Sequence, residues 1–335
     1  MSGVPPLPRY NRHVKLGIIG LGFMGSTHAK AAVNLPCVQV TAVCSRDEQK
    51  LSGDFSTVRG NSGDVGGQVD FSGVTRHHDI TAILADPNVE AVDICLPTGM
   101  HERVAIDAMR AGKHVLVEKP MAPDGAAADR MLAEADRSGR ILMTAQVIRF
   151  WPEYVALRDT LISGELGALR TALFRRRCAA PSWGVWETSG AFDLLIHDVD
   201  FTVHLFGKPT TISATGYIDD AAGIDVLHAN FFYPNGVEAL VTGGWHNRGS
   251  YPFSMEYTAT FDRDTMEFST ASGQGVLQSP PGAAYAAELA HFGEACDNDR
   301  QPPLCPAGES ADAVKLMLLA IEARKHKGEK ILCNL

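Results

Sequence analysis

The first part of the chain alternates short apolar runs with segments of helical periodicity. The runs are rich in Val, Ile and Leu without alternating polar positions, which is typical of strands buried on both faces. They cover Val14–Ile19, Val38–Cys44, Ala91–Leu96, His114–Val117 and Ile141–Val147. Strands and helices in alternation imply right-handed crossovers between parallel strands. We therefore expect an α/β fold that begins with a doubly wound parallel sheet, in a domain over residues 12–145.

From Trp151 the pattern changes to long helices and hairpins. Residues 152–164 and 190–206 have helical periodicity, and residues 168–178 indicate a strand. Two later pairs of apolar runs flank turn residues, Pro234-Asn235-Gly236 and Asp262-Arg263-Asp264, as in β-hairpins. We expect an α+β domain over residues 146–335, with a large, open and mostly antiparallel sheet and helices on one side.

Within the first domain, the segment Gly53–Gly73 has neither strand nor helix periodicity. It holds six glycines in 21 residues and is predicted to be a mobile surface loop.

Composition excludes several classes of protein. The 335 residues carry 39 acidic and 30 basic side chains, a net charge of −9, so a nucleic-acid or membrane partner is not expected. Seven cysteines lack metal-ligand spacing, which favours reduced thiols. Residues 1–13 lack the apolar stretch of a secretory signal, and no apolar run is long enough to span a bilayer. We expect a cytoplasmic protein.

A phosphate-binding loop follows the first predicted strand. Gly20-Leu21-Gly22-Phe23-Met24-Gly25 matches the G-x-G-x-x-G pattern and opens a helix, as a dinucleotide site requires. The first glycine permits a tight turn, the second lets a pyrophosphate approach the backbone, and the third lets helix and strand pack closely. The N–H groups at the start of the helix would then face the phosphates.

The residue that reads the adenosine ribose is expected about 20 positions further on. That position holds Ser45 and Arg46, whose donors suit a 2′-phosphate, so NADP(H) is favoured over NAD(H). In the alternative, Arg46 is a solvated loop residue and Asp47 accepts hydrogen bonds from the ribose hydroxyls.

Candidate catalytic groups occur in two places. Glu118-Lys119-Pro120 follows the strand at 114–117, at the sheet edge where ligands bind in this fold. The helix over 190–206 carries two acids and two imidazoles on one face, Asp193, His197, Asp200 and His204. Asp193 lies four residues before His197, so a carboxylate could orient the ring and favour its charged form, giving a general base near neutral pH. This polar face of the helix could instead be solvated, or it could bind a metal ion. A second helix carries no matching ligands, however, so no metal is predicted.

Several motifs, in order along nearly the whole chain, resemble the Gfo/Idh/MocA oxidoreductases. They are the phosphate loop, Pro97-Thr98-Gly99-Met100-His101, Ala111–Pro120, Ser163–Gly167 and Asp193-x-x-x-His197-Asp198. The resemblance implies a Rossmann domain followed by an α/β domain that forms homodimers or homotetramers through its sheet. It implies that Lys119 lies near the reacting carbon, that Asp193 orients the substrate or the base, and that His197 is the acid/base.

The resemblance also assigns weaker roles. Pro97, Thr98 and His101 would border the nicotinamide, Glu118 would contact its ribose, and Arg149 would face the substrate cleft. Asp200 and His204 are not signature positions, so we expect them to be packing or surface residues. Trp183, Trp186 and Trp245 have side chains that could stack on a sugar, although core packing is the commoner use of a tryptophan.

These patterns together predict an NAD(P)-dependent oxidoreductase. Hydride would pass between the nicotinamide and a secondary alcohol or ketone of a sugar, an inositol-like polyol or a sugar derivative. His197 would take the proton, Asp193 would stabilise the imidazolium, and Lys119 would stabilise the alkoxide. Two alternatives remain open: an NAD-dependent glycoside hydrolase on the same fold, and a cofactor-binding regulator without turnover.

Overall fold

The computed structural model describes residues 13–60, 66–180, 189–247, 249, 251–276 and 282–335. Its first sheet has six parallel strands in the order β3-β2-β1-β4-β5-β6, the order of a dinucleotide-binding fold. The strands are β1 (Val14–Ile19), β2 (Val38–Cys44), β3 (Thr75–His77), β4 (Ala91–Ile94), β5 (His114–Glu118) and β6 (Leu142–Ala145). The predicted doubly wound parallel sheet is confirmed, with the short strand β3 added at its edge.

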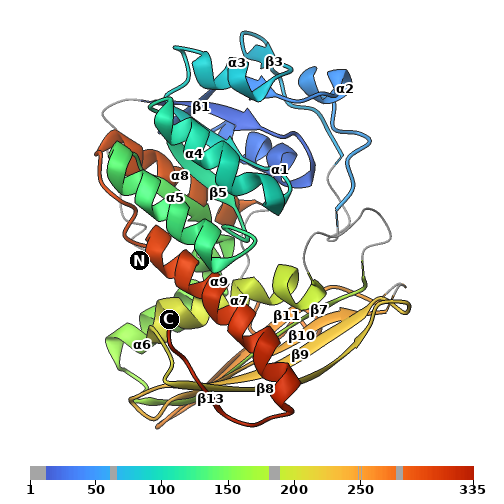
Figure 1. Cartoon of the computed structure of the whole chain (residues 1–335), viewed down its shortest axis with the longest axis vertical. Helices are drawn as coiled ribbons and strands as arrows, with labels where there is room; N and C mark the ends of the chain where they lie inside the picture. Colours follow the sequence, from blue (N-terminus) through green and yellow to red (C-terminus); the bar gives the residue numbers. More distant parts are fainter. Residues whose placement is uncertain (1–12, 61–65, 181–188, 248, 250, 277–281) are drawn as a thin grey trace, which may run out of the picture.

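Helices cross between these strands and cover both faces of the sheet (Figure 1). They are α1 (Phe23–Ala32), α2 (Glu48–Leu51), α3 (Ile80–Ala85), α4 (His101–Arg110) and α5 (Gly125–Ser138), with a single 3₁₀ turn, η1 (Thr98–Met100), before α4. Side-chain caps mark several helix starts: Asp79 accepts hydrogen bonds from Thr81 N and Ala82 N, and Asp124 from Ala127 N. The helix ends that lead into β5 and β6 turn at Gly112 and Gly139, both at positive φ.

The second sheet has seven strands in the order β12-β11-β7-β10-β9-β8-β13. Its members are β7 (Leu169–Cys178), β8 (Thr211–Asp219), β9 (Ile224–Phe232), β10 (Glu238–His246), β11 (Ser254–Phe261), β12 (Thr265–Ser269) and β13 (Ile331–Leu332). Among the described strands of this sheet, only β7 and β10 pair in parallel, so the sheet is mostly antiparallel, as predicted.

One face of the second sheet is covered by α7 (Gly190–Phe206) and α9 (Ala307–Ala323), which lie between the two sheets (Figure 1). Along β7 the three consecutive arginines alternate between faces: Arg176 is buried toward α7, whereas Arg175 and Arg177 lie on the opposite face with Glu256. A turn, η2 (Val147–Phe150), and α6 (Pro152–Ser163) join the two sheets.

The first sheet ends with β6 and the second begins with β7, and a later helix packs back on the first sheet. Helix α8 (Ala283–Asp297) returns to the first sheet, where Leu289 and Phe292 pack in one core cluster with Val14 and Leu16. Gly293 faces β2, because a Cβ there would lie 2.7 Å from Val38 Cγ2. Within the described residues, no helix combines the length and apolar character that a membrane span needs.

In the described parts of Gly53–Gly73, residues 53–60 and 66–73, the structure differs from the expected mobile surface loop; residues 61–65 lie outside the described residues. Phe55 and Phe71 are buried and meet edge to face with ring centroids 6.1 Å apart. Val69 N donates to Gly53 O, and Phe55 N donates to Gly67 O, so the two arms of the segment are joined by backbone hydrogen bonds. Buried apolar side chains thus hold both arms of the segment against the first domain. The high glycine content of the segment gave no indication of this packing.

Candidate active site

The phosphate loop has the geometry that a dinucleotide requires. Gly20 has φ +92°, and a Cβ there would lie 2.4 Å from Cys95 O. A Cβ on Gly25 would lie 1.8 Å from Gly20 O, so only glycine lets α1 approach the strand this closely. A Cβ on Gly22 would meet nothing within 4 Å. The open space beside Gly22 and the uncapped start of α1 fit a bound pyrophosphate.

A cavity of about 900 Å³ extends from this loop along the carboxyl ends of β1, β2 and β4. Its lining includes four of the predicted cofactor residues, Gly20, Ser45, Arg46 and Pro97. Lys50, His78 and Arg103 add further basic groups, which the sequence motifs did not indicate. The cavity therefore fits the adenosine half of a nicotinamide dinucleotide.

Asp47, the alternative ribose ligand, also lines this cavity but has partners of its own. Its carboxylate accepts a hydrogen bond from Lys50 N at 3.3 Å and lies 3.3 Å from Lys50 Nζ. The hydrogen bond from that backbone N–H lowers the pKa of Asp47. The carboxylate thus caps the short helix α2.

A second cavity, of about 340 Å³, lies between the two sheets. Phe23, Met24, Glu118 and Lys119 reach it from the first domain, and Asp193 and His197 reach it from α7. The structure therefore brings the two predicted groups of catalytic residues to one cavity. Its other described side chains were not singled out from the sequence; they include Trp151, Arg176, Phe253, Met255 and Tyr285.

Lys119 and Asp193 form a direct contact across this cavity. Lys119 Nζ donates hydrogen bonds of 3.0 Å to both Asp193 Oδ1 and Asp193 O. The side chains are only 17% and 23% exposed, so the pair is largely shielded from solvent. This differs from the expectation that Asp193 orients His197, because the carboxylate is turned to the lysine.

His197 lies one helical turn after Asp193 and is partly buried. Its Nδ1 is shielded from solvent and has no hydrogen-bond partner within the described residues. Burial, followed by the nearby charges of Lys119 and Arg176, lowers the pKa of His197 well below its usual 6.5. The ring is therefore neutral at pH 7, contrary to the expected charged form, and is able to accept a proton.

Arg176 approaches the cavity from β7 and is held by Asp198, the residue after His197. Arg176 Nε and Nη2 donate to Asp198 at 2.8 and 3.0 Å, and the two side chains are 3% and 0% exposed. The alternation of side chains along a strand separates Arg176 from its two neighbours, but nothing in the sequence indicates its partner.

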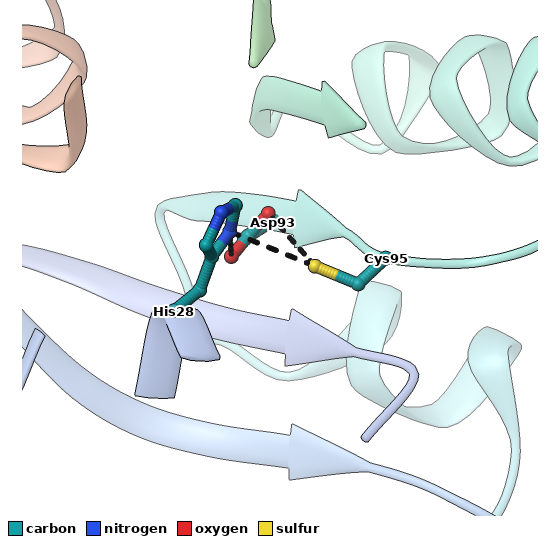
Figure 2. A group of neighbouring side chains, drawn as sticks. All are labelled: His28, Asp93 and Cys95. Atoms are coloured by element: carbon teal, nitrogen blue, oxygen red, sulfur yellow. Dashed lines mark hydrogen bonds and ion pairs between the residues drawn. The ribbon is translucent and has the colours of Figure 1, made fainter. Parts of the chain in front are cut away.

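Glu118 belongs to a buried cluster of charged groups beneath the cavity. Glu118 Oε2 accepts a hydrogen bond from Lys119 N, and Glu118 Oε1 lies 3.4 Å from His28 Nε2. Figure 2 shows the other side of the same ring, where His28 Nδ1 lies 2.8 Å from Asp93 and 3.7 Å from Cys95 Sγ. These donor types could hold a metal ion, but 2.8 Å is a hydrogen-bond distance, so we interpret the group as an ion pair.

Several predicted residues lie elsewhere. Thr98 and His101 are outside both cavity linings; the His101 ring lies 2.7 Å from Leu96 O and 2.9 Å from Pro120 O, and so joins the two loops that border the site. Trp245 packs against Gly190 and is 8% exposed. Trp183 and Trp186 lie outside the described residues.

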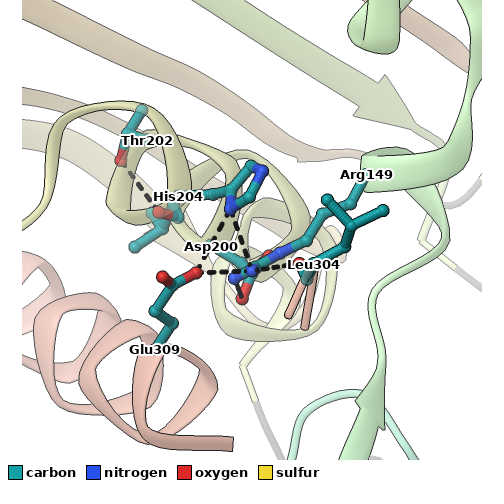
Figure 3. A network of polar contacts seen from close by, with 7 residues as sticks. Arg149, Asp200, Thr202, His204, Leu304 and Glu309 are labelled. Carbon is teal, nitrogen blue, oxygen red and sulfur yellow. Dashed lines mark hydrogen bonds and ion pairs between the residues drawn. The ribbon is translucent and has the colours of Figure 1, made fainter. Parts of the chain in front are cut away.

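Arg149 is also away from the cavity, contrary to the expected substrate contact. Figure 3 shows its guanidinium enclosed by Asp200, His204, Glu309 and Leu304 O. Two hydrogen bonds of 2.7 Å reach Asp200, and both side chains are 0% exposed. Asp200 and His204 are thus packing residues, as expected, and Arg149 is their partner.

Comparisons with known proteins agree with this architecture. The model of an oxidoreductase family with an NAD-binding Rossmann fold, GFO/IDH/MocA, matches residues 14–146, and the GFO/IDH/MocA C-terminal domain matches residues 154–267. The fold is shared with the crystal structure of GenD2 from gentamicin A biosynthesis in complex with NAD, with a TM-score of 0.83, 19% identity and full coverage of both chains.

Two curated relatives are 30% identical to the chain. One is a trans-1,2-dihydrobenzene-1,2-diol dehydrogenase from Mus musculus, aligned over 68% of each chain. The other is inositol 2-dehydrogenase 4 from Saccharopolyspora erythraea, aligned over 79% of this chain and 87% of the relative. On these matches and on its two-sheet architecture, the chain is an oxidoreductase that belongs to the Gfo/Idh/MocA family.

Proposed function

We propose that the protein is an NAD(P)-dependent dehydrogenase that oxidises a secondary alcohol of a sugar, a polyol or a related hydroxylated molecule to the ketone, and catalyses the reverse reduction. The observation that carries the proposal is the meeting of Lys119, Asp193 and His197 in one cavity next to the phosphate loop. The names of the relatives, a dihydrodiol dehydrogenase and an inositol dehydrogenase, support the same reaction class.

The residues present fit a nicotinamide dinucleotide. Gly20, Gly22 and Gly25, with the start of α1, would hold the pyrophosphate, and Ser45 and Arg46 would hold the adenosine side. Phe23, Met24 and Glu118 would border the nicotinamide and its ribose. The loop beside the nicotinamide would be shaped by Pro97, Thr98 and His101. When bound in its oxidised form, this cofactor supplies the acceptor for the carbinol hydrogen, which leaves as hydride with two electrons.

The protein's own groups handle the remaining proton. His197 is neutral and accepts the hydroxyl proton as general base. Lys119 Nζ stabilises the negative charge that develops on the oxygen. Asp193 holds Lys119 in place through the two hydrogen bonds to its ammonium group, so Asp193 acts through the lysine rather than through the imidazole.

The basic groups around the larger cavity favour NADP(H) over NAD(H). Arg46 and Lys50 line it, and the carboxylate of Asp47 is occupied by Lys50. A guanidinium suits a 2′-phosphate, whereas an unoccupied acid would suit a 2′-hydroxyl. Arg46→Ala should raise the Kd for NADPH at least 10-fold and leave the Kd for NADH within 2-fold, measured by quenching of protein fluorescence. Equal changes for both cofactors would exclude Arg46 as the discriminating residue.

We also propose that the protein forms a homodimer or homotetramer through the second sheet. One face of that sheet is covered by α7 and α9, and its opposite face carries no helix of the described chain (Figure 1). Light scattering of the purified protein gives its mass directly, and a monomer at micromolar concentration would contradict the proposal.

The reaction is tested by the absorbance of reduced nicotinamide. The purified protein is offered NADP⁺ and NAD⁺ separately with inositols, aldoses, sugar acids, nucleotide sugars and simple secondary alcohols. We expect turnover, and a loss of at least 100-fold in kcat for both His197→Ala and Lys119→Met with the Kd for cofactor within about 3-fold of wild type. Full activity in either variant would contradict its catalytic role. Absence of turnover on every secondary alcohol would contradict the proposed function.

A further inference from the structure

One glycine of the segment Gly53–Gly73 reaches the smaller cavity. Gly60 is part of the cavity lining, together with Phe23 and Met24 at the start of α1. Among the described residues of the segment, Gly60 alone lines this cavity. The segment, which no motif in the sequence covers, therefore contributes to the wall of the candidate active site.

Gly60 lies directly against the Phe23 ring. A Cβ on Gly60 would come within 1.9 Å of Phe23 Cε2, 2.1 Å of Phe23 Cδ2 and 2.6 Å of Phe23 Cζ, so the ring leaves no room for a side chain. The backbone of Gly60 does not have a positive φ and would itself accept alanine. The close approach to the ring is therefore the reason why glycine is needed at this position.

The arm that carries Gly60 is held by the core of the first domain. Phe55 and Val58 are 0% and 5% exposed, and they belong to the core cluster against which Phe23 packs. Val58 N donates to Phe55 O at 2.9 Å, and Phe55 N donates to Gly67 O at 3.0 Å. Gly60 follows Val58 by only two residues. A collision at Gly60 would thus be relieved by a movement of the partly buried Phe23 ring rather than by retreat of the arm.

The returning arm is tied to the same helix as the first. Lys30 Nζ donates a hydrogen bond of 2.8 Å to Gly66 O and lies 6.0 Å from the centroid of the Phe55 ring. Lys30 lies about two turns after Phe23 on α1. The segment is therefore in contact with α1 both at its first residue and two turns later, and the start of this helix is where the pyrophosphate would bind.

From these contacts we infer that Gly60 is a positioning residue for the cofactor. The backbone at Gly60 supports the Phe23 ring beside the nicotinamide, and the lack of a side chain keeps the ring out of the space that the nicotinamide needs. This inference rests on the proposed cofactor and is independent of the substrate. Neither Phe23 nor Gly60 belongs to the described lining of the larger cavity, so the adenosine half of the cofactor would not depend on them.

The variant Gly60→Ala separates the two halves of the cofactor. Its Cβ should drive the Phe23 ring into the smaller cavity and raise the Kd for NADPH and NADH at least 10-fold, measured by quenching of protein fluorescence. The Kd for 2′,5′-ADP and for ADP, which lack the nicotinamide, should stay within 2-fold of wild type in calorimetric titrations. Gly66→Ala is the matched control, because a Cβ at that glycine meets nothing within 4 Å, and it should bind all four ligands as wild type does.

A second background identifies the ring as the cause. In Phe23→Ala there is no ring to displace, so addition of Gly60→Ala should change the Kd for NADPH less than 2-fold. An equal rise in both backgrounds would overturn the inference, and so would a rise for 2′,5′-ADP and ADP as large as that for the dinucleotides.

Hydrogen exchange of the wild-type protein tests the contact without any substitution. NADPH should slow exchange of the Phe55 and Val58 amides at least 5-fold more than 2′,5′-ADP does, because only the complete dinucleotide would press on Phe23. Equal protection by the two ligands would overturn the inference, as would wild-type affinity of Gly60→Ala for NADPH, and both results would leave the proposed dehydrogenase intact. A wild-type protein that binds neither NADPH nor NADH would overturn the proposed function as well.

Discussion

At the scale of single residues, the neutral state of His197 determines how activity depends on pH. Burial and the charges of Lys119 and Arg176 lower the pKa of His197 well below 6.5, so the base is already deprotonated at pH 7. We therefore expect kcat/KM for alcohol oxidation to be level from pH 8 down to 6.5 and to fall only in more acidic buffer. In Lys119→Met, which removes one of the two cations, the acid limb of the residual activity should move to higher pH. An acid limb centred above pH 7 in the wild type would contradict this account.

The same residues show what a sequence can and cannot predict about a site. The strand-end position of Lys119 and the helical face of Asp193 and His197 indicated a common site only together with the family resemblance, and all three residues line one cavity. Their pairing was not predictable, because Asp193 is equally able to contact a residue one turn along its own helix or a lysine from another domain. Arg149 illustrates the same limit: its partners come from α7, α9 and the segment before α9, which the sequence cannot bring together.

At the scale of elements, α1 depends on one buried histidine. Burial alone would lower the pKa of His28, but Asp93, with help from Glu118 and Glu288, raises it to about 10. The charged ring lies 2.8 Å from Asp93, and burial raises the pKa of its other two neighbours, Glu118 and Glu288, so Asp93 is the anion that the ring chiefly compensates. His28→Gln should lower the free energy of unfolding by about 3–5 kcal/mol, since buried Asp93 loses its cation. Urea unfolding at pH 7 measures this loss.

The pH dependence of stability gives a second measurement of the same element. The pKa of His28 is higher in the folded than in the unfolded state, so its contribution is complete below pH 6.5 and is lost as pH rises from 6.5 through 10. The wild-type urea midpoint should fall over that range, and the fall should be smaller in His28→Gln. His326→Gln, at an exposed position, is the control and should behave as wild type. An equal fall in all three proteins would show that His28 is not the titrating group.

Elements with a strong apolar pattern were predictable, and those without one were not. β1 has the predicted bounds because a strand buried on both faces leaves an almost continuous apolar run, and β2 has them because Val, Ala and Cys at most of its positions still mark it as a strand. β8 was missed because only Ile212 and Ala214 of its nine residues are buried. α8 was missed because alanines on all its sides leave little contrast between its faces.

At the scale of the whole molecule, the two sheets are joined by segments that return across the expected domain boundary. α8 completes the core of the first sheet although it follows the last long strand of the second. α9 packs on α7 and also contacts α5. The cavity that contains Lys119 and His197 is formed by residues of both halves, so its shape depends on how firmly the halves are held together.

Arg149 is the buried group that links these segments, because it lies on the turn after β6 and pairs with Asp200 of α7 and Glu309 of α9 (Figure 3). Arg149→Met should lower the free energy of unfolding by about 3–5 kcal/mol, since Asp200 is left buried without its cation. The double variant Arg149→Met/Asp200→Leu should recover part of that loss, because it removes the uncompensated charge. Arg170→Met, which breaks an exposed pair with Asp262, should cost less than about 1 kcal/mol in the same urea titration. A substrate contact would give the opposite pattern in Arg149→Lys, a raised KM with unchanged stability, and that result would restore the role expected from the family resemblance.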